Sequence, residues 1–299
     1  MKIAAVVVTY NRKALLERVI QCLKASTVAV DIIVVNNGST DGTAEWLAAQ
    51  SGLRVIHQAN VGGSGGFYTG ILAAFDAGAD LIWCMDDDVF PATDCLATLL
   101  TEKQTLGERV GILCPRRMQR GEVFVNECRQ LDLTHTFASL HKRRLTATEP
   151  VPVDIEGMVF EGPLISREVV EKIGLPNKDL FIFFDDTDYS YRAVQAGFRV
   201  VYVPDAVLEK EKFFTSDTWV VKQQKKKWKR RYQIRNAAYF NHHYGRHFGV
   251  RYVRPFVSAL GSISTALWLA IWRRGYSWTD VKSFWKAYLD GVSEHLGIY

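Results

Sequence analysis

The stretch LIWCMDDDVF, residues 81–90, places five apolar residues directly before three adjacent carboxylates, those of Asp86, Asp87 and Asp88. Such an uninterrupted apolar run is typical of a strand that is buried on both faces. Adjacent carboxylates repel one another and resist removal from water, so a positive charge is expected beside them. A divalent cation would supply that charge, because Mg²⁺ and Mn²⁺ prefer oxygen ligands. The alternative is a solvated acidic turn that caps the following helix.

On the N-terminal side of this stretch, strand-like and helix-like patterns alternate. The strand-like runs are 3–9, 31–36 and 53–58, and the segments with apolar residues at helical spacing are 13–26, 43–50 and 65–78. This alternation predicts an α/β fold with a doubly wound, mostly parallel sheet, in which ligands bind at the carboxyl ends of the strands. A hydrophobic content of 48% is sufficient for a substantial core and excludes a disordered chain.

Polar residues follow the first two predicted strands as well as the strand at 81–86. Thr9, Tyr10 and Asn11 come after the first strand, and the turn NNGSTDGT at 36–43 comes after the second. Because the carboxyl ends of parallel strands meet at one edge of a sheet, we expect these residues to lie beside the aspartate triplet. The turn at 36–43 either binds a base or ribose, or is an ordinary turn that caps the next helix.

A glycine-rich segment, NVGGSGGFYTG at 60–70, precedes the helical pattern at 65–78. Backbone N–H groups at such a segment can approach an anion closely. The glycines concerned are Gly62, Gly63, Gly65 and Gly66. The spacing differs from that of a Walker loop, so a flexible loop without a ligand is the alternative.

A second acidic cluster, FFDDTDYSYRA at 183–193, again follows an apolar run. Its carboxylates are those of Asp185, Asp186 and Asp188. A carboxylate in a partly apolar setting near a cation-bound nucleotide is a suitable general base. The alternative is that these acids stabilise the N-terminus of the helix that follows.

The chain divides by composition into an acidic N-terminal part and a basic C-terminal part. From Asp217 to the end there are 15 Lys and Arg against 4 Asp and Glu, so we predict a catalytic domain at 1–216 and a helical region at 217–299. Between about 110 and 155 the pattern is difficult to assign, and 198–205 is predicted to be a strand that ends at Pro204.

The C-terminal region interleaves Lys and Arg with aromatic residues, and then contains the uncharged run 256–272. That run is short for a transmembrane helix, and we expect an interfacial helix pair on an anionic membrane surface. A solvated helix face and a nucleic-acid-binding tail are the alternatives. Three histidines here are expected to be structural rather than metal ligands, namely His242, His243 and His247.

The compartment is expected to be the cytoplasm, at the inner face of the membrane. The N-terminal run has no cleavage site of small residues, which argues against a signal peptide. Five scattered cysteines without a CxxC pair fit buried thiols in a reducing environment. They are Cys22, Cys84, Cys95, Cys114 and Cys128.

Taken together, the motifs resemble family 2 glycosyltransferases of the GT-A fold, and most closely the branch that contains galactofuranosyltransferases and rhamnosyltransferases. The resemblance covers roughly residues 1–210. It is carried by VVVTYNR (6–12), VVNNGSTDGT (34–43), NVGGSGGFYTG (60–70), MDDD (85–88) and FFDDTDYSYRAVQAGFRV (183–200).

The resemblance implies roles for these residues. Asp86 and Asp88 match metal ligands for Mn²⁺ or Mg²⁺, Asp87 lies near the donor, and Asp186, with Asp185 beside it, matches the general base. The donor-binding positions it implies are Thr9, Tyr10, Asn11, Asn37 and the four glycines of the 60–70 segment. Many relatives complete the metal shell with a His after the last strand. This chain has Glu209, Lys210 and Glu211 there. We expect a carboxylate, that of Glu209, to be the ligand, and the alternative is that Lys210 replaces the charge of the cation on the diphosphate.

The activity implied is inverting transfer of a sugar onto a hydroxyl of a lipid-linked or polysaccharide acceptor, in bacterial cell-surface glycan synthesis. UDP-galactofuranose is the donor that the motifs favour, and dTDP-rhamnose is the alternative. A nucleotidyltransferase would have a Gly- and Arg-containing loop directly after the first strand, and TYNRKALL at 9–16 does not match that pattern. The nucleic-acid-binding alternative would leave both acidic clusters unexplained.

Overall fold

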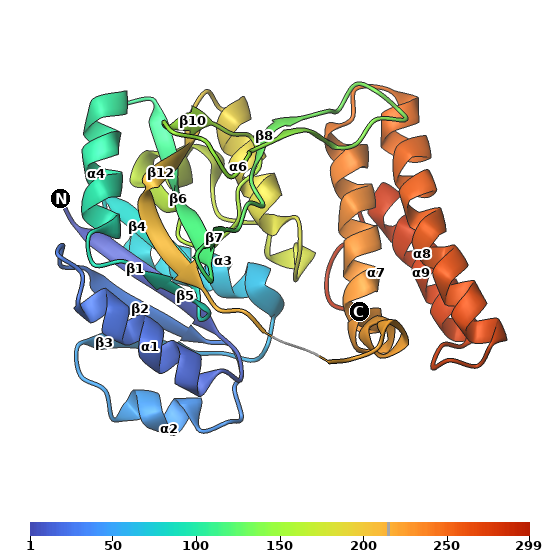
Figure 1. The fold of residues 1–299 in the computed structure, drawn as a ribbon, viewed down its shortest axis with the longest axis horizontal. Helices are drawn as coiled ribbons and strands as arrows, with labels where there is room; N and C mark the ends of the chain where they lie inside the picture. The colour runs from blue at the N-terminus through green and yellow to red at the C-terminus, as the bar shows by residue number, and fades with distance from the viewer. Residues whose placement is uncertain (214–215) are drawn as a thin grey trace. The chain divides into compact units, whose positions relative to one another are not determined.

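In the computed structural model, which describes residues 1–213 and 216–299, the apolar runs predicted as strands all belong to one ten-stranded sheet (Figure 1). The strands are β1 (Ile3–Thr9), β2 (Asp31–Asn36), β3 (Leu53–His57), β4 (Leu81–Asp86), β5 (Val89–Pro91), β6 (Val110–Gln119), β7 (Glu122–Val123), β10 (Val153–Asp154), β11 (Leu164–Ser166) and β12 (Arg199–Lys210), with β8 (Cys128–Leu131) and β9 (His141–Arg144) in a separate two-stranded sheet. The main order is β10-β12-β6-β11-β4-β1-β2-β3. Strands β1 to β4 are parallel, and the antiparallel β11 separates them from the parallel pair β6 and β12.

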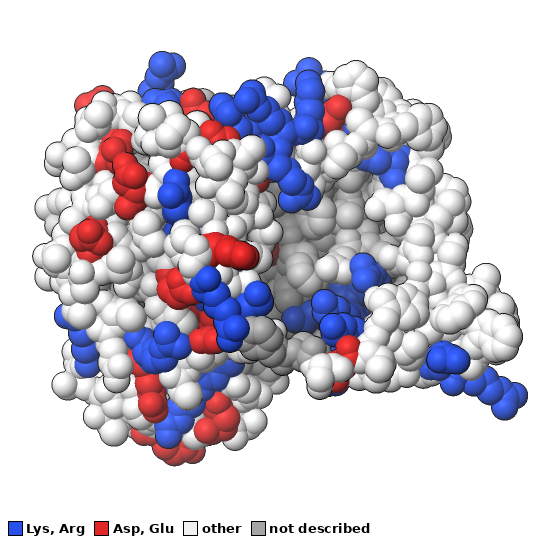
Figure 2. All heavy atoms as spheres, in the orientation of Figure 1, with Lys and Arg blue, Asp and Glu red and all other residues white. Residues whose placement is uncertain are grey.

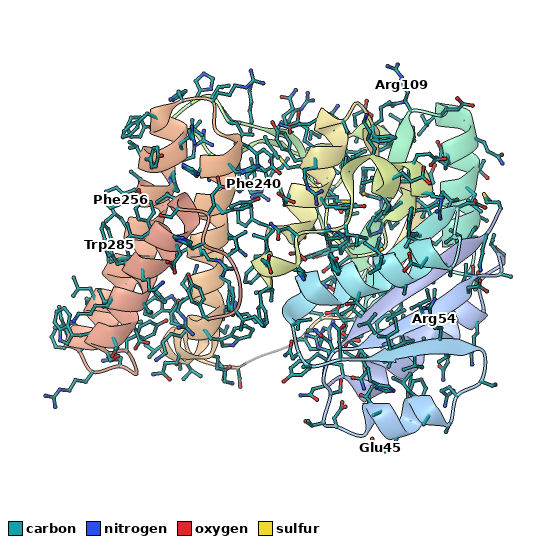
Figure 3. All side chains as sticks on the ribbon, turned by 180° about the vertical axis from the view of Figure 1, so that it is seen from behind. Glu45, Arg54, Arg109, Phe240, Phe256 and Trp285 are labelled. Carbon is teal, nitrogen blue, oxygen red and sulfur yellow. The ribbon has the colours of Figure 1, made fainter. Side chains whose placement is uncertain are left out.

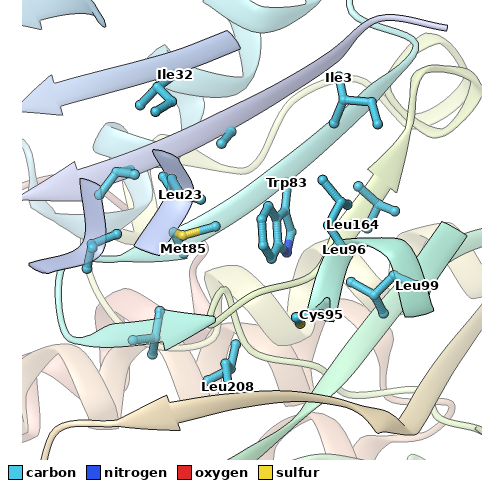
Figure 4. Packing of buried hydrophobic residues seen from close by; sticks show 14 of the residues in the cluster. Ile3, Leu23, Ile32, Trp83, Met85, Cys95, Leu96, Leu99, Leu164 and Leu208 are labelled. Atoms are coloured by element: carbon cyan, nitrogen blue, oxygen red, sulfur yellow. The ribbon is translucent and has the colours of Figure 1, made fainter. Parts of the chain in front are cut away.

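Helices cover both faces of this sheet. They are α1 (Lys13–Lys24), α2 (Thr43–Ala48), α3 (Gly62–Asp76), α4 (Cys95–Leu106), α5 (Arg167–Ile173) and α6 (Asp185–Gln195). Alternate residues of β1 serve two cores: Ala5 and Val7 pack in one, and Val6 and Val8 pack in the other. Figure 4 shows the first core around the fully buried Trp83, whose indole N–H donates to the carbonyl of Gly162 at 2.9 Å. The doubly wound α/β architecture is therefore as predicted.

The strand register aligns the ends that carry polar residues. Thr9 pairs with Asn36, and Val8 pairs with Asp86, so the carboxyl ends of β1, β2 and β4 lie side by side. This arrangement follows from parallel pairing of three apolar runs of similar length, as the sequence predicted.

The glycine-rich segment is not a loop before a helix, because α3 begins at Gly62 itself. Two of its glycines allow α3 to pack closely on β1, where a side chain would clash. A Cβ at Gly66 would lie 2.4 Å from Cγ1 of Val8, and one at Gly70 would lie 2.3 Å from Cγ1 of Val6. A side chain at either position would push the helix away from the sheet. A Cβ at Gly63 would meet nothing within 4 Å, so the first turn is open on that side.

Strand β12 does not end at Pro204 but continues to Lys210. Its pairing with β6 shifts register between Val203 and Val207, and Pro204 lies in this irregular stretch. Proline is tolerated where a strand bulges, because its missing N–H then removes no ladder hydrogen bond. The extension carries Glu209 and Lys210 to the end of the sheet where β4 and β5 meet.

The chain forms two compact units. The N-terminal unit comprises Met1–Leu131, Arg143–Lys178 and Asp186–Lys212, and the helical unit comprises Asp132–Lys142, Asp179–Asp185 and Phe213–Tyr299. The prediction placed a single boundary between 216 and 217. In the structure the last segment of the helical unit begins at Phe213, and this unit also includes the two short stretches Asp132–Lys142 and Asp179–Asp185. Its helices are α7 (Trp219–Tyr244), α8 (Arg254–Ile271) and α9 (Trp278–Val292), and a π-helical turn at Gly249–Val253 precedes α8.

One described helix, Gly249–Ile271, is long and apolar enough to cross a membrane by length and composition. Its most apolar window has a mean hydropathy of 1.2, and 28% of that window is buried. The sequence prediction began this run only at 256, because it did not include the π-helical turn that extends the helix toward its N-terminus.

Candidate active site

The aspartate triplet lies where β4 ends and turns into β5, and a basic side chain accompanies it. Asp87 is 3% exposed, and its carboxylate accepts hydrogen bonds from the Thr9 hydroxyl at 2.7 Å and from Arg12 at 3.0 Å. Arg12 also donates to Asp88 at 3.0 Å. The positive charge that the triplet requires is thus supplied in part from the turn after β1.

A second basic side chain reaches the triplet from the end of β12. The ammonium of Lys210 lies 3.1 Å from Oδ1 of Asp88 and 2.6 Å from Oε1 of Glu161. Carboxylate oxygens of Asp86, Asp88 and Glu161 all lie within 4.8 Å of one another. We call these three residues the acid group. Glu161 was not predicted from the sequence; the only signal was its position directly after the apolar residues 158–160.

Glu161 is fixed from behind by a buried guanidinium. Arg117 on β6 has 0% side-chain exposure and pairs with Glu161 and, at 2.7 Å, with Glu127. Although burial opposes ionisation, Arg117 and Lys210 hold the pKa of Glu161 below its usual range. Glu161 therefore stays a carboxylate at neutral pH.

The electrostatics of the acid group leave room for a cation. Counting Asp87 and Glu127 with the acid group, there are two more carboxylates than the basic side chains Arg12, Lys210 and Arg117 that contact them. Removal from water and the negative charges of Asp88 and Glu161 raise the pKa of Asp86 well above its usual range, and Lys210 opposes this only in part. Three oxygen donors with this surplus of negative charge fit a divalent ion such as Mg²⁺ or Mn²⁺.

Glu209, the expected metal ligand, does not join the acid group. It is exposed, and its carboxylate accepts a hydrogen bond from the backbone N–H of Arg120 at 2.8 Å. Because successive side chains of a strand point to opposite faces, Lys210 rather than Glu209 faces Asp88. In this geometry Glu161, and not Glu209, places a carboxylate oxygen beside those of Asp86 and Asp88.

The predicted donor-binding residues surround the same sheet edge, and most are already hydrogen-bonded. Tyr10 is 46% exposed, and its backbone N–H donates to Asp87. Asn11 has a positive φ of 52°, and its side chain accepts from the N–H of Thr40 at 2.7 Å. Asn37 is 2% exposed and donates to the carbonyl of Gly62 at 2.9 Å. Asn37 thereby ties the end of β2 to the start of α3.

The first turn of α3 offers groups for an anion. The N–H groups of a helix's first turn have no partner within the helix and carry a partial positive charge. The hydroxyl of Ser64 in this turn is completely buried and makes no hydrogen bond to any residue that the structure describes. Gly63 precedes it with open space on its side, whereas Gly62 is buried and its N–H already donates to Oδ1 of Asn60 at 3.0 Å.

The second acidic cluster forms the first turn of α6. Asp185 is 7% exposed, whereas Asp186 is partly exposed and accepts from the N–H of Thr187 at 2.6 Å. Asp188 is buried and pairs with Arg192 at 2.9 Å, so its role is to stabilise the helix. Of the three acids, Asp186 is the one that combines exposure with a position at the start of the helix.

A short segment joins α6 to the acid group. The hydroxyl of Ser190 on α6 accepts from the N–H of Met158 at 3.1 Å. The ring of Phe160 stacks on Phe67 of α3 at 4.4 Å and packs against Tyr189 of α6 at 5.9 Å. The next residue along the chain is Glu161. The segment 156–161 therefore holds together the glycine-rich helix, the second acidic cluster and one member of the acid group.

Comparison with known proteins agrees with this geometry. The profile of the family described as "Glycosyltransferase like family 2" matches residues 2–231. The chain belongs to glycosyltransferase family 2. This glycosyltransferase is 32% identical over 210 residues to Galactofuranosyltransferase GlfT1 of Mycobacterium tuberculosis, and the match covers 64% of each chain. The chain therefore spans somewhat less than two thirds of that relative's own length.

A second similar protein is named for a different sugar, mannose. The glycosyltransferase is 30% identical over 215 residues to Polyprenol monophosphomannose synthase of Mycolicibacterium smegmatis, with 69% of this chain and 77% of the relative covered. The predicted family and its galactofuranosyltransferase branch are confirmed.

Solved structures confirm the GT-A fold. S. aureus TarS 1–349 matches with a TM-score of 0.56 at 13% identity, covering 99% of the glycosyltransferase and 82% of TarS. The mannosyltransferase PcManGT from Pyrobaculum calidifontis, solved with GDP-Man and Mn²⁺, matches with a TM-score of 0.52 at 13% identity, covering 98% of this chain and 87% of its own.

Proposed function

We propose that this glycosyltransferase transfers galactofuranose from UDP-galactofuranose onto a hydroxyl of a lipid-linked or polysaccharide acceptor, with inversion at the anomeric carbon and with a divalent cation. The observation that carries the proposal is the acid group of Asp86, Asp88 and Glu161, whose carboxylate oxygens all lie within 4.8 Å of one another at the carboxyl end of β4. Similarity to GlfT1 favours the galactofuranose donor. The alternative donor is dTDP-rhamnose.

The reaction requires stabilisation of the leaving group and removal of a proton from the acceptor, and different residues carry out these two steps. A divalent cation at the acid group would stabilise the negative charge of the departing nucleotide diphosphate. Lys210 and Arg12 add fixed positive charge beside the same carboxylates. Asp186 accepts the proton of the acceptor hydroxyl while that oxygen bonds to the anomeric carbon and the bond from this carbon to the diphosphate breaks. Direct displacement of this kind inverts the anomeric centre and needs no covalent enzyme intermediate.

The donor is tested with a panel of UDP- and dTDP-linked sugars in the presence of Mn²⁺. We expect UDP-galactofuranose to give the highest rate of nucleotide release and the largest increase in melting temperature. Metal dependence is checked by repeating the assay after chelation, which should lower nucleotide release. A folded protein that neither binds nor turns over any sugar of the panel would contradict the proposed function, and preference for dTDP-rhamnose would select the alternative donor.

Association with an anionic membrane surface is the second part of the proposal, and the helical unit carries its evidence. Among the described residues, all exposed large apolar side chains except those of Met1, Tyr10 and Val151 lie in this unit. Trp272, directly after α8, is 63% exposed, and Trp278, the first residue of α9, is 62% exposed; two adjacent arginines, Arg273 and Arg274, lie between them in the sequence. Figure 2 shows that acidic side chains are few on the visible face of this unit. Exposed Trp beside Arg is typical of a membrane interface.

Replacing Trp272 and Trp278 together by Ser is expected to weaken binding to phosphatidylglycerol-containing vesicles by about tenfold or more, because each ring loses its burial in the lipid interface. Vesicle flotation measures this, and vesicles of phosphatidylcholine alone should bind the parent protein less. Val151→Ser, an exposed apolar residue of the N-terminal unit, is the matched control and should bind as the parent does. Equal binding by the double variant would contradict the membrane surface proposed here.

A further inference from the structure

The five residues directly before α6, Leu180 to Phe184, have an unusual backbone. Phe181, Phe183 and Phe184 have φ values of 66°, 69° and 67°. Residues with a side chain avoid this left-handed region, and a cluster of them persists only where the surroundings hold it. We call residues 180–184 the phenylalanine coil. It ends at Asp185, where α6 begins.

Two adjacent side chains of α7 hold this coil, both from within the helical unit. The amide of Asn236, which is 0% exposed, donates to three carbonyls at 2.9 Å each, those of Leu180, Ile182 and Phe183. Arg235, which is 1% exposed, donates to the carbonyl of Leu180 at 3.0 Å. Three carbonyls from within four residues, 180–183, converge on one amide, and this requires the tight winding that the φ values record.

Arg235 also sets the orientation of the Asn236 amide. The Nε of Arg235 donates to Oδ1 of Asn236 at 2.8 Å, so the NH₂ group faces the coil. Aromatic contacts complete the support: Phe181 stacks on Tyr232 at 4.7 Å, and Phe184 packs against Phe240 at 5.6 Å. Figure 3 labels Phe240 on α7. The coil is therefore anchored through its carbonyls and its rings to one helix.

We propose that Arg235 and Asn236 are positioning residues for the carboxylate of Asp186. The proposal rests on the function proposed above, in which Asp186 is the general base. The backbone dihedrals of the coil fix where the first turn of α6 starts, and Asp186 is the second residue of that turn. The two α7 residues act on Asp186 through the backbone of the coil that precedes it.

The test is Asn236→Leu, which removes the amide donor from the carbonyls of Ile182 and Phe183, while the carbonyl of Leu180 keeps its hydrogen bond from Arg235. The expected result is a fall in the kcat of glycosyl transfer of about 10-fold to 100-fold, because a displaced base loses part of the 10²–10⁴-fold that general base catalysis contributes. The KM for the donor and the Kd for UDP should stay within about twofold of the parent values. Hydrogen exchange in a peptide covering 179–188 should become faster.

Asn241→Ala is the matched control, because Asn241 is also buried on α7 but donates to Ala237 of its own helix at 2.8 Å. It should leave kcat and exchange at 179–188 unchanged. Asn236→Ser, which can retain a single donor, is expected to fall between the parent and Asn236→Leu and serves if the Leu variant does not fold.

Two outcomes separate this inference from the proposed function. If Asp186→Asn transfers sugar as fast as the parent, the base assignment is wrong and the positioning role is overturned with it. If Asp186→Asn is inactive while the Asn236 variants keep the parent kcat, or lose UDP affinity and kcat equally, the positioning role alone is overturned.

Discussion

Replacing Asp186 by Asn is expected to lower the kcat of glycosyl transfer by about 10²–10⁴-fold, the contribution of a general base. The amide keeps the size of the carboxylate and its place in the first turn of α6, but it cannot accept the proton of the acceptor hydroxyl. Because Asp186 is not a member of the acid group, binding of UDP with Mn²⁺ should be retained. Single-turnover transfer and calorimetry with UDP measure the two quantities separately.

Asp188→Asn is the control for this variant, because it makes the same chemical change two residues further along α6. Asp188 is buried and pairs with Arg192, so its loss should lower the melting temperature while the folded fraction keeps its kcat. A parent-like kcat in Asp186→Asn, or an equal loss in both variants, would remove the case for Asp186 as the base.

Replacing Arg117 by Met is expected to lower the free energy of unfolding by about 3–5 kcal/mol, the usual cost of removing one partner from a buried ion pair. The guanidinium is fully buried between Glu127 and Glu161, and Met fills similar space without compensating either carboxylate. Glu127, which is 2% exposed, would be left with a buried charge. Urea denaturation followed by circular dichroism measures the change.

Arg129→Met is the control for Arg117→Met. Arg129 has 25% side-chain exposure and lies 3.8 Å from Glu149, so its pair is partly solvated. We expect a loss of about 0–1 kcal/mol there. A similar small loss in Arg117→Met would show that the buried network is not a major source of stability.

The sequence predicted the parts of the fold that depend on local pattern. Apolar runs of similar length predicted β1, β2 and β4, and parallel pairing then required Thr9, Asn36 and Asp86 to meet at one edge. The aspartate triplet was recognised because charge after an apolar run is unusual at any position of a chain.

What the sequence did not reveal depends on distant pairing. Glu161 precedes the short antiparallel strand β11, whose place beside β4 no periodicity indicates. Lys210 was a candidate from the sequence, but its contact with Asp88 requires β12 to continue past Pro204, and a proline normally argues for the end of a strand. The coil at 180–184 belongs to the helical unit because of side chain to backbone hydrogen bonds, which leave no trace in composition.

The position of Lys210 at the end of β12 has a consequence for synthesis of the chain on the ribosome. Strands β1 to β4 and the aspartate triplet emerge more than a hundred residues before the ammonium that compensates Asp88 and Glu161. Strand β6 also lacks the hydrogen bonds to its parallel neighbour until β12 has been synthesised. A nascent chain stopped before residue 199 should therefore hold a partly formed sheet in which Arg12 and Arg117 are present beside the carboxylates but Lys210 is missing, and the proposed nucleotide site should be completed only when the final strand emerges.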